Sequence, residues 1–236
     1  MRDFKQLQKQ LKIKFKNIDL LRQAVVHRSY LNENPDFALE HNERLEFLGD
    51  AVLELVVTDY LYLQYQNPEG ELTNWRSSLV NAKMLSQKAK VLNLNDYLFL
   101  SRGETKDEGK AREIILANAF EALIGAIYLD QGYSTAQDFI SRHILSELPK
   151  ILENNLYLDP KSKLQELTQD KFCVTPTYKV LEEWGPDHAR EFRIGVYLEN
   201  QQIGEGKGLS KQQAQVVAAE KALAEKGWED FEPVAK

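Results

Sequence analysis

The spacing of apolar residues changes once along this chain, after Pro149. Before that point, apolar residues recur every three or four positions, as between Leu45 and Val56, which is the period of an amphipathic helix. Between Phe192 and Leu198 every second residue is a large apolar one, which is the period of a half-buried strand. A chain of 236 residues is long enough for two cores. The sequence therefore predicts an all-α domain followed by an α+β domain.

We expect a helical domain over residues 1–150, a linker over 151–159, a second domain over 160–229 and a tail over 230–236. Within the second domain the pattern predicts a helix over 162–170, strands over 177–184, 191–199 and 201–206, and a helix over 211–226. Ser210 followed by Gln213 is a capping-box pattern that marks the start of the last helix. The charged run 101–113, which contains two glycines, predicts a loop or mobile lid.

Composition excludes several classes of protein. Cys173 is the only cysteine, so a disulfide framework and a cysteine-rich metal site are ruled out, and we expect a packed side chain in a reduced, cytoplasmic protein. The apolar stretches 51–63 and 117–129 are interrupted by acids and are too short to span a membrane. The net charge is −4 over residues 1–159 and −1 over 160–229, so no segment is expected to be strongly basic. Nucleic-acid binding would then depend on a few specifically placed cations.

Acidic residues stand at unusual places on two predicted helices. Glu43, Glu46 and Asp50 share one helix face, for which a solvated acidic stripe is the simplest interpretation. Apolar residues on both sides argue against it, because carboxylates held this close and partly desolvated repel one another unless a cation neutralises them. Asn118 and Glu121 stand three apart on a second helix that is otherwise apolar. If the two helices pack together, Glu46, Asp50, Asn118 and Glu121 form a cluster of oxygen ligands suited to Mg²⁺ or Mn²⁺ and unsuited to zinc. Such cations promote phosphodiester hydrolysis.

Five segments of the first domain resemble the bacterial ribonuclease III family. They are HRSYLNE (27–33), HNERLEFLGDAVL (41–53), EGELTNWRSSLVN (69–81), LSRGE (100–104) and ILANAFEALIGAIYLDQG (115–132). The resemblance implies a homodimeric, divalent-metal-dependent endoribonuclease specific for double-stranded RNA, with no small-molecule cofactor. It implies products with 5′-phosphate and 3′-hydroxyl ends and short 3′ overhangs, and a role in processing structured precursor RNAs, including ribosomal and messenger RNA.

Matched to the family's motifs, Asp50 and Glu121 are implied to be catalytic, and Glu46, Asp50, Asn118 and Glu121 to bind the metal. Glu43 and Glu69 match acids tied to RNA handling and scission, and Phe47 matches an aromatic residue of the dimer interface. Asn118 stands where the family most often has aspartate. The amide oxygen can still ligate Mg²⁺, but the site loses one negative charge. A working site is favoured because Glu46, Asp50 and Glu121 are all present, and a non-cleaving clamp on RNA duplexes is the alternative.

The second domain resembles a double-stranded RNA-binding domain through DPKSKLQEL (159–167), PTYKV (176–180), GPDHAREF (185–192) and GKGLSKQQAQVVAAEKAL (206–223). The residues implied to contact RNA are Gln165, Glu166, Pro186, Asp187, His188, Lys207 and Lys211, with Lys163 as a secondary candidate. A-form RNA is recognised mostly by shape, which suits this assignment better than duplex DNA. Gln212 and Gln215 occupy positions that are often cationic in the family, so we expect modest affinity and a shallow salt dependence.

Two histidines of the first domain and the three tryptophans are interpreted as structural. His27 and His41 lie near the predicted acidic cluster, but each ring is expected to cap or brace a helix, because metal-activated water needs no histidine. Trp75, Trp184 and Trp228 are expected to be packed in the cores, since duplex RNA does not expose its base faces.

Overall fold

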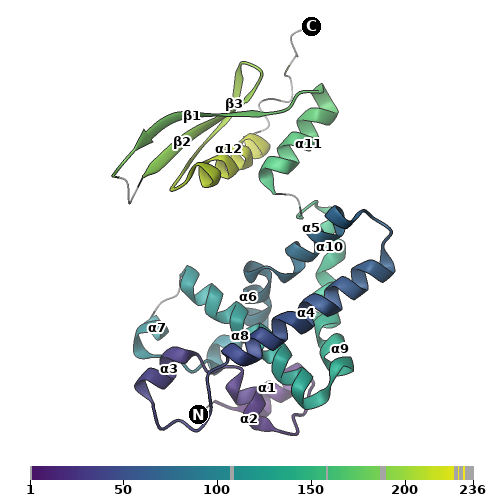
Figure 1. Ribbon diagram of the computed structural model, residues 1–236, viewed down its shortest axis with the longest axis vertical. Coiled ribbons are helices and arrows are strands. Elements are labelled where there is room, and N and C mark those ends of the chain that lie inside the picture. Colours follow the sequence, from purple (N-terminus) through teal and green to yellow (C-terminus); the bar gives the residue numbers. More distant parts are fainter. Residues whose placement is uncertain are drawn as a thin grey trace. The chain divides into compact units, whose positions relative to one another are not determined.

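The structure is a computed structural model, which describes residues 2–106, 109–157, 159–186 and 190–225 together with Trp228 and Phe231 (Figure 1). It divides into two compact units, residues 1–157 and 158–236. Among the described residues of the first unit there are helices and no strand pairs beyond an isolated bridge between Val26 and Phe99. The second unit has a helix, three strands and a helix, as predicted.

The helices of the first unit are α1 (Phe4–Leu11), α2 (Ile18–Gln23), α3 (Arg28–Glu33), α4 (Glu43–Gln64), α5 (Glu69–Val80), α6 (Ala82–Val91), α7 (Arg102–Lys106), α8 (Lys110–Gln131), α9 (Tyr133–His143) and α10 (Leu148–Glu153), with short 3₁₀ turns at Leu94–Tyr97 and Leu145–Glu147. None of the helices within the described residues is both long enough and apolar enough to cross a membrane.

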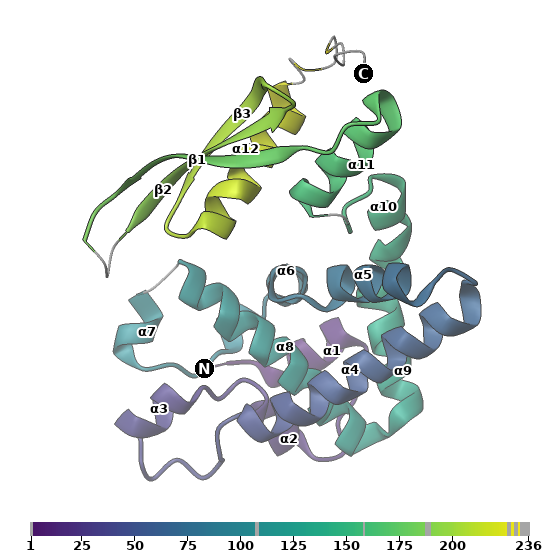
Figure 2. The ribbon, with the colours of Figure 1, turned by 45° about the horizontal axis from the view of Figure 1, so that its top comes forward.

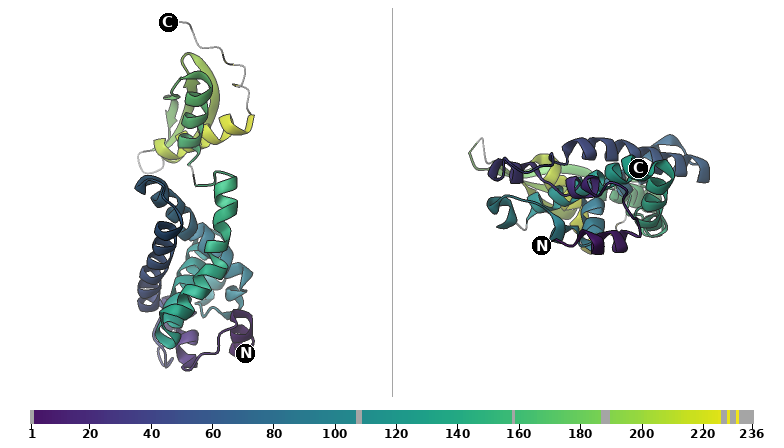
Figure 3. Two further views of the ribbon diagram at one scale, coloured as in Figure 1. Left: turned by 90° about the vertical axis from the view of Figure 1, so that its right-hand side faces the viewer. Right: turned by 90° about the horizontal axis from the view of Figure 1, so that it is seen from below.

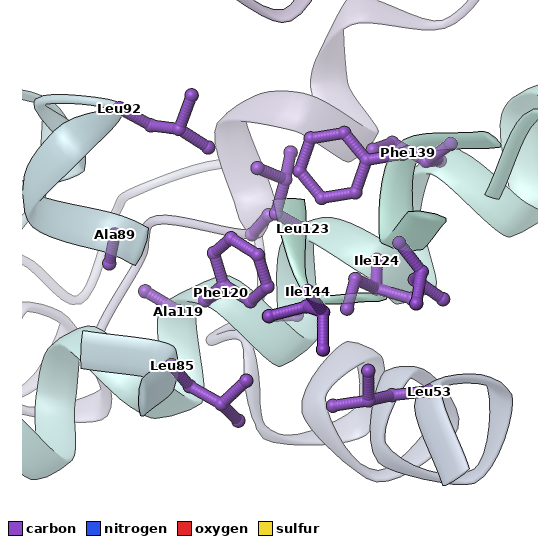
Figure 4. Close-up of a cluster of buried hydrophobic side chains, with 14 of the residues drawn as sticks. Leu53, Leu85, Ala89, Leu92, Ala119, Phe120, Leu123, Ile124, Phe139 and Ile144 are labelled. Carbon is purple, nitrogen blue, oxygen red and sulfur yellow. The ribbon is translucent and has the colours of Figure 1, made fainter. Parts of the chain in front are cut away.

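Helix α8 forms the centre of the first unit. Its residues 115–127 are nearly all buried, because α4, α6 and α9 pack against different sides of it. Figure 4 shows Phe120 of α8 near Leu85 of α6 and Phe139 of α9. The Phe120 and Phe139 rings lie 5.6 Å apart, centroid to centroid. A helix surrounded in this way is expected to be apolar on every side, which makes Asn118 and Glu121 conspicuous on it.

Helices α4 and α8 cross in direct backbone contact, and two glycines permit it (Figure 2). A Cβ atom on Gly49 of α4 would lie 1.8 Å from the Glu121 carbonyl oxygen, and one on Gly125 of α8 would lie 2.2 Å from the Leu45 carbonyl oxygen. Neither distance is compatible with a side chain. The two glycines therefore fix which residues of α4 face which residues of α8.

The predicted loop over residues 101–113 is wrong, because this segment contains α7 and the start of α8. The Ser101 hydroxyl accepts a hydrogen bond from the Glu104 amide (3.2 Å), which caps the first turn of α7. Two groups of α3 hold the same end: Ser29 Oγ accepts from the Ser101 amide (3.1 Å) and Glu33 from the Arg102 amide (3.2 Å). Long-range caps thus stabilise a helix in a segment whose charge and glycines predicted none.

The first unit continues past residue 150. Ile151 of α10 is buried, and the Tyr157 ring packs edge-on against Trp75 with centroids 6.0 Å apart. Residues 151–157, which fall in the predicted linker, therefore belong to the first compact unit.

The second unit consists of α11 (Pro160–Phe172), β1 (Thr177–Trp184), β2 (Glu191–Leu198), β3 (Gln201–Gly208) and α12 (Lys211–Glu225). The strands form an antiparallel sheet in the order β1-β2-β3. Leu164 of α11 and three alanines of α12 pack against apolar side chains of β2 and β3, so both helices cover one face of the sheet (Figure 3). A Cβ on Gly206 would lie 2.3 Å from the Ala214 carbonyl oxygen, which shows how closely α12 approaches β3.

Two expectations about packing were wrong. Cys173 is exposed at the end of α11, where it caps the helix with a left-handed backbone (φ 56°). Trp184 is 37% exposed at the end of β1, whereas Trp75 and Trp228 are buried as predicted.

Candidate active site

The α4–α8 crossing brings carboxylates from both helices together. Burial, together with the negative charges of Asp50 and Glu46, raises the pKa of Glu121 to about 8. Burial and the charge of Glu43 also raise the pKa of Glu46; a hydrogen bond from Asn118 partly offsets this, and Asp50 adds to the rise. Glu46, Asp50, Asn118 and Glu121, which the sequence predicts to lie in one cluster, thus share one electrostatic environment.

Glu43, beside the cluster, has cationic neighbours, whereas the other three carboxylates have none among the described residues. Arg28 Nη1 lies 3.3 Å from Glu43, and His41 Nδ1 lies 3.8 Å from the same carboxylate. Among the described residues, no lysine, arginine or histidine forms an ion pair with Glu46, Asp50 or Glu121. The cluster therefore contains partly buried negative charge without a compensating group, which is costly unless a cation or a proton neutralises it.

The donor set fits a hard divalent cation in its chemistry. It offers carboxylate and amide oxygens without thiol or imidazole, as Mg²⁺ and Mn²⁺ prefer. Within the described part of the chain, however, no three Asp, Glu, His or Cys side chains converge closely enough to hold an ion in the present conformation. Asp50 and Glu46 lie close enough to raise the pKa of Glu121, and ligation requires the carboxylate side chains to turn towards a common point.

Asn118 acts as a hydrogen-bond donor in this arrangement. The Asn118 side chain lowers the pKa of Glu46, which is the effect of an amide N–H directed at a carboxylate that only accepts hydrogen bonds. An aspartate at this position would replace the donor by a further negative charge. The departure from the family pattern therefore stabilises the carboxylate cluster when no cation is bound.

Other residues assigned to the first domain lie away from the cluster. Glu69 begins α5, accepts a hydrogen bond from Thr73 Oγ1 (3.1 Å) and lines a groove against the C-terminal half of α4. Glu46 is in the first turn of α4, about 18 Å along the helix from Thr58 in that groove. Within one chain, the structure does not bring Glu69 to the carboxylates.

Phe47 is 81% exposed, and Leu55 and Tyr62, which fall on the same side of α4, are also exposed.

His27 has the structural role expected of it. Its Nδ1 accepts a hydrogen bond from the Ser29 amide (3.4 Å) at the start of α3, and burial lowers its pKa. The ring is therefore neutral at pH 7 and caps a helix.

In the second unit, the predicted RNA contacts occupy two exposed regions. Gln165 and Glu166 are exposed on α11, and Pro186 is exposed after β1, while Asp187 and His188 lie outside the described residues. Lys211 is the first residue of α12, with its ammonium 5.5 Å from the centre of the Phe192 ring. Lys207 on β3 lies similarly over Trp184 at 5.6 Å. These contacts orient both lysines without neutralising them.

The sequence did not predict one contact in this unit. Lys161 Nζ donates to Gln215 Oε1 (2.7 Å) and lies 5.0 Å from the centre of the Tyr178 ring. Gln215, at a position that is often cationic in the family, thus binds Lys161 of α11. A cation at position 215 would repel that lysine.

Comparison with known proteins agrees with this architecture. A family model described as "Ribonuclease-III-like" matches residues 17–148, and one described as "Double-stranded RNA binding motif" matches residues 160–226. The Ribonuclease 3 of Dehalococcoides mccartyi is 42% identical over 224 residues, which are 94% of each chain. The Ribonuclease 3 of Protochlamydia amoebophila is 46% identical over 211 residues, 89% of this chain and 86% of that one. This chain belongs to the ribonuclease III family.

A solved structure supports the assignment of the first unit. The nuclease domain of ribonuclease III from Campylobacter jejuni is similar with a TM-score of 0.56 and 39% identity, and the match covers 62% of this chain and 99% of that domain. That domain is described as structurally flexible in a region involved in dimer formation. The ribonuclease III assignment and the predicted fold class, a helical nuclease domain followed by an α+β double-stranded RNA binding motif, are both confirmed.

Proposed function

We propose that this ribonuclease III family member is an endonuclease that hydrolyses double-stranded RNA with the help of a divalent cation. The observation that carries the proposal is the cluster of Glu46, Asp50 and Glu121, which the glycine crossing holds together although no ion pair within the described residues neutralises it. Structural clusters of acids normally have basic partners, whereas catalytic ones are completed by metal and substrate.

The residues that would hold Mg²⁺ or Mn²⁺ are Glu46, Asp50, Asn118 and Glu121. When bound, the ion supplies positive charge to the phosphodiester and promotes attack by water at neutral pH. Asp50 and Glu121, the two assigned catalytic acids, belong to different helices, so the crossing sets their separation. Burial of Glu121 excludes solvent from that side of the site, which strengthens its interaction with a bound cation.

In this proposal water attacks the phosphorus and the bond to the 3′ oxygen breaks, which leaves 5′-phosphate and 3′-hydroxyl ends, with short 3′ overhangs where two sites cut opposite strands. Two sites require two subunits. We infer a homodimer in which the exposed side of α4, including Phe47, is covered by the partner, because an aromatic side chain with 81% exposure favours an interface. Glu43 and Glu69 are assigned to RNA handling in this proposal.

The second unit would hold the duplex through Gln165, Glu166, the turn after Pro186, Lys207 and Lys211. Glutamine and glutamate on α11 suit 2′-hydroxyl groups, and Lys211 at the start of α12 suits phosphates, where the helix dipole adds to its charge. We infer that the natural substrates are structured cytoplasmic precursor RNAs, including ribosomal RNA.

A second candidate function is a clamp that binds duplexes without cutting them. The observation in its favour is Asn118, which removes one negative charge from the predicted ligand set. The carboxylates Glu46, Asp50 and Glu121 are all present, so we favour the nuclease.

Cleavage of a perfect RNA duplex across a Mg²⁺ titration tests the proposal. We expect cleavage that requires the cation and is lost in Asp50→Asn, whereas the control Asp138→Asn, which removes an exposed carboxylate on α9, retains it. Binding without cleavage at every Mg²⁺ concentration would support the clamp. Equal cleavage by Asp50→Asn would contradict the assigned site.

A further inference from the structure

The first seventeen residues are strongly basic within an acidic chain. They contain six cations and one acid, a net charge of +5, whereas the remaining residues contain 24 cations and 35 acids, a net charge of −11. We expected no strongly basic segment because the charge was summed over 159 residues, and this short segment was averaged out. Five of these cations form what we call the lysine ridge: Lys5, Lys9, Lys12, Lys14 and Lys16.

The fold exposes every lysine of the ridge. Lys5 and Lys9 lie one turn apart on the exposed side of α1, opposite the buried Phe4, Leu7 and Leu11. After the helix, Lys12, Lys14 and Lys16 are exposed and alternate with the buried Ile13 and Phe15. Lys12 ends α1 with a left-handed backbone (φ 56°), and Lys14 and Lys16 follow it outside any helix. The ridge is therefore a group of five exposed positive charges close together in the sequence.

The backbone beneath the ridge is held firmly. Gln8 Oε1 accepts a hydrogen bond from the Phe15 amide (2.9 Å), and Gln131 Nε2 donates to the Lys14 carbonyl (3.1 Å). The Asp130 carboxylate accepts from the amides of Lys16 (2.8 Å) and Asn17 (2.7 Å). Asp130 thus binds backbone, and within the described residues no ion pair joins any lysine of the ridge to an acid.

Helix stability accounts for only part of this arrangement. Lys9 lies in the last turn of α1, where a positive charge interacts favourably with the helix dipole. Lys14 and Lys16 lie outside any helix, so the dipole does not explain them. Neighbouring like charges repel, and no ion pair within the described residues joins a ridge lysine to an acid, although the nearby charge of Lys16 helps to lower the pKa of Asp130. An anionic partner bound to the ridge would reduce the remaining repulsion.

We propose that the lysine ridge is an additional binding surface for the phosphate backbone of duplex RNA, separate from the carboxylate cluster. A polyanion can contact several of these exposed charges at once, and lysines contact phosphates without reading sequence. The rest of the chain carries −11, so this surface is a positive region on an otherwise acidic chain and attracts a polyanion. Asp130, which anchors Lys16, lies nine residues beyond Glu121 on α8, about 14 Å along the helix. The ridge therefore adds contacts beyond the cleavage site.

This inference rests on the proposed RNA substrate but not on cleavage, so the test measures binding in EDTA. The dissociation constant of the full chain for an RNA duplex is measured between about 50 and 300 mM KCl for the wild type and for a Lys14→Gln/Lys16→Gln variant. The matched control, Lys83→Gln/Lys150→Gln, removes the same charge from exposed positions of the first unit. All four side chains are exposed, so thermal unfolding is expected to be unchanged in both variants.

We expect the ridge variant to lower the slope of log affinity against log salt by about 2, since each lost phosphate contact removes about 0.9, and the control to match the wild type. Equal slopes in all three proteins would overturn the proposal. Loss of binding to phosphatidylserine vesicles with an unchanged RNA slope would also overturn it, in favour of a lipid surface. A wild type that does not bind the duplex would overturn both this inference and the proposed function, whereas cleavage by Asp50→Asn would overturn only the latter.

Discussion

Both units contain a close backbone contact that glycine permits, but the residues beside the two contacts differ. In the first, Gly49 and Gly125 let α4 and α8 cross with their backbones in contact; in the second, Gly206 lets α12 approach β3 equally closely. Beside the first contact lie Glu46, Asp50 and Glu121, whereas beside the second lie alanines. Close backbone approach is a matter of packing alone. What makes one contact a candidate active site is the partly buried negative charge next to it.

Substitution of Gly49 is expected to have the largest effect. In Gly49→Ala the new Cβ would overlap the Glu121 carbonyl, so α4 must move away from α8. We expect a loss of about 3 kcal/mol in the free energy of unfolding, measured with urea, and loss of duplex cleavage. Gly103→Ala is the control, because its nearest neighbour would be 3.8 Å away. Normal cleavage by Gly49→Ala would show that the crossing does not position the carboxylates.

The corresponding change in the second unit separates binding from catalysis. We expect Gly206→Ala to destabilise that unit by about 2 kcal/mol and to weaken duplex binding. The Mg²⁺ concentration that gives half-maximal cleavage should stay unchanged, because the carboxylates belong to the other unit. A shift in that concentration would mean that the two contacts are not independent.

The raised pKa of Glu121 predicts how stability depends on pH without metal. Its folded pKa of about 8 exceeds the value of about 4.5 in an unfolded chain, so the stability contributed by the protonated form is present below pH 4.5 and is lost as pH rises towards 8. Glu121→Gln mimics the protonated form. In EDTA at about pH 8.5, it should be about 2 kcal/mol more stable than the wild type, and the difference should vanish near about pH 4. Urea unfolding at both pH values measures this, and a constant difference would argue against the shift.

Asn118→Asp should have the smallest effect and the most specific one. It replaces the donor to Glu46 by a negative charge, so we expect a loss of about 1 kcal/mol in stability in EDTA. In Mg²⁺ the added carboxylate should instead lower the concentration needed for half-maximal cleavage. Asn74→Asp, at an exposed position of α5, should change neither. Unchanged Mg²⁺ dependence in Asn118→Asp would show that the charge at this position is irrelevant.

Periodicity alone located the acids of α4 and α8, because carboxylates on an apolar helix are conspicuous in any context. The crossing itself was not predictable in this way, since nothing local distinguishes Gly49 and Gly125 from glycines at turns. The error over residues 101–113 has a similar cause: besides the local Ser101 cap, the start of α7 is held by Ser29 and Glu33, about seventy residues earlier. The lysine ridge was visible in the sequence but was lost in a sum over a long segment.

Binding of Mn²⁺, followed by electron paramagnetic resonance without RNA, tests the central claim most directly. We expect the wild type to bind Mn²⁺ in competition with Mg²⁺, and Asp50→Asn and Glu121→Gln to lose at least about tenfold in affinity. The control Asp138→Asn should bind like the wild type. Equal Mn²⁺ affinity in all four proteins would contradict the assignment of the α4–α8 crossing as the metal site.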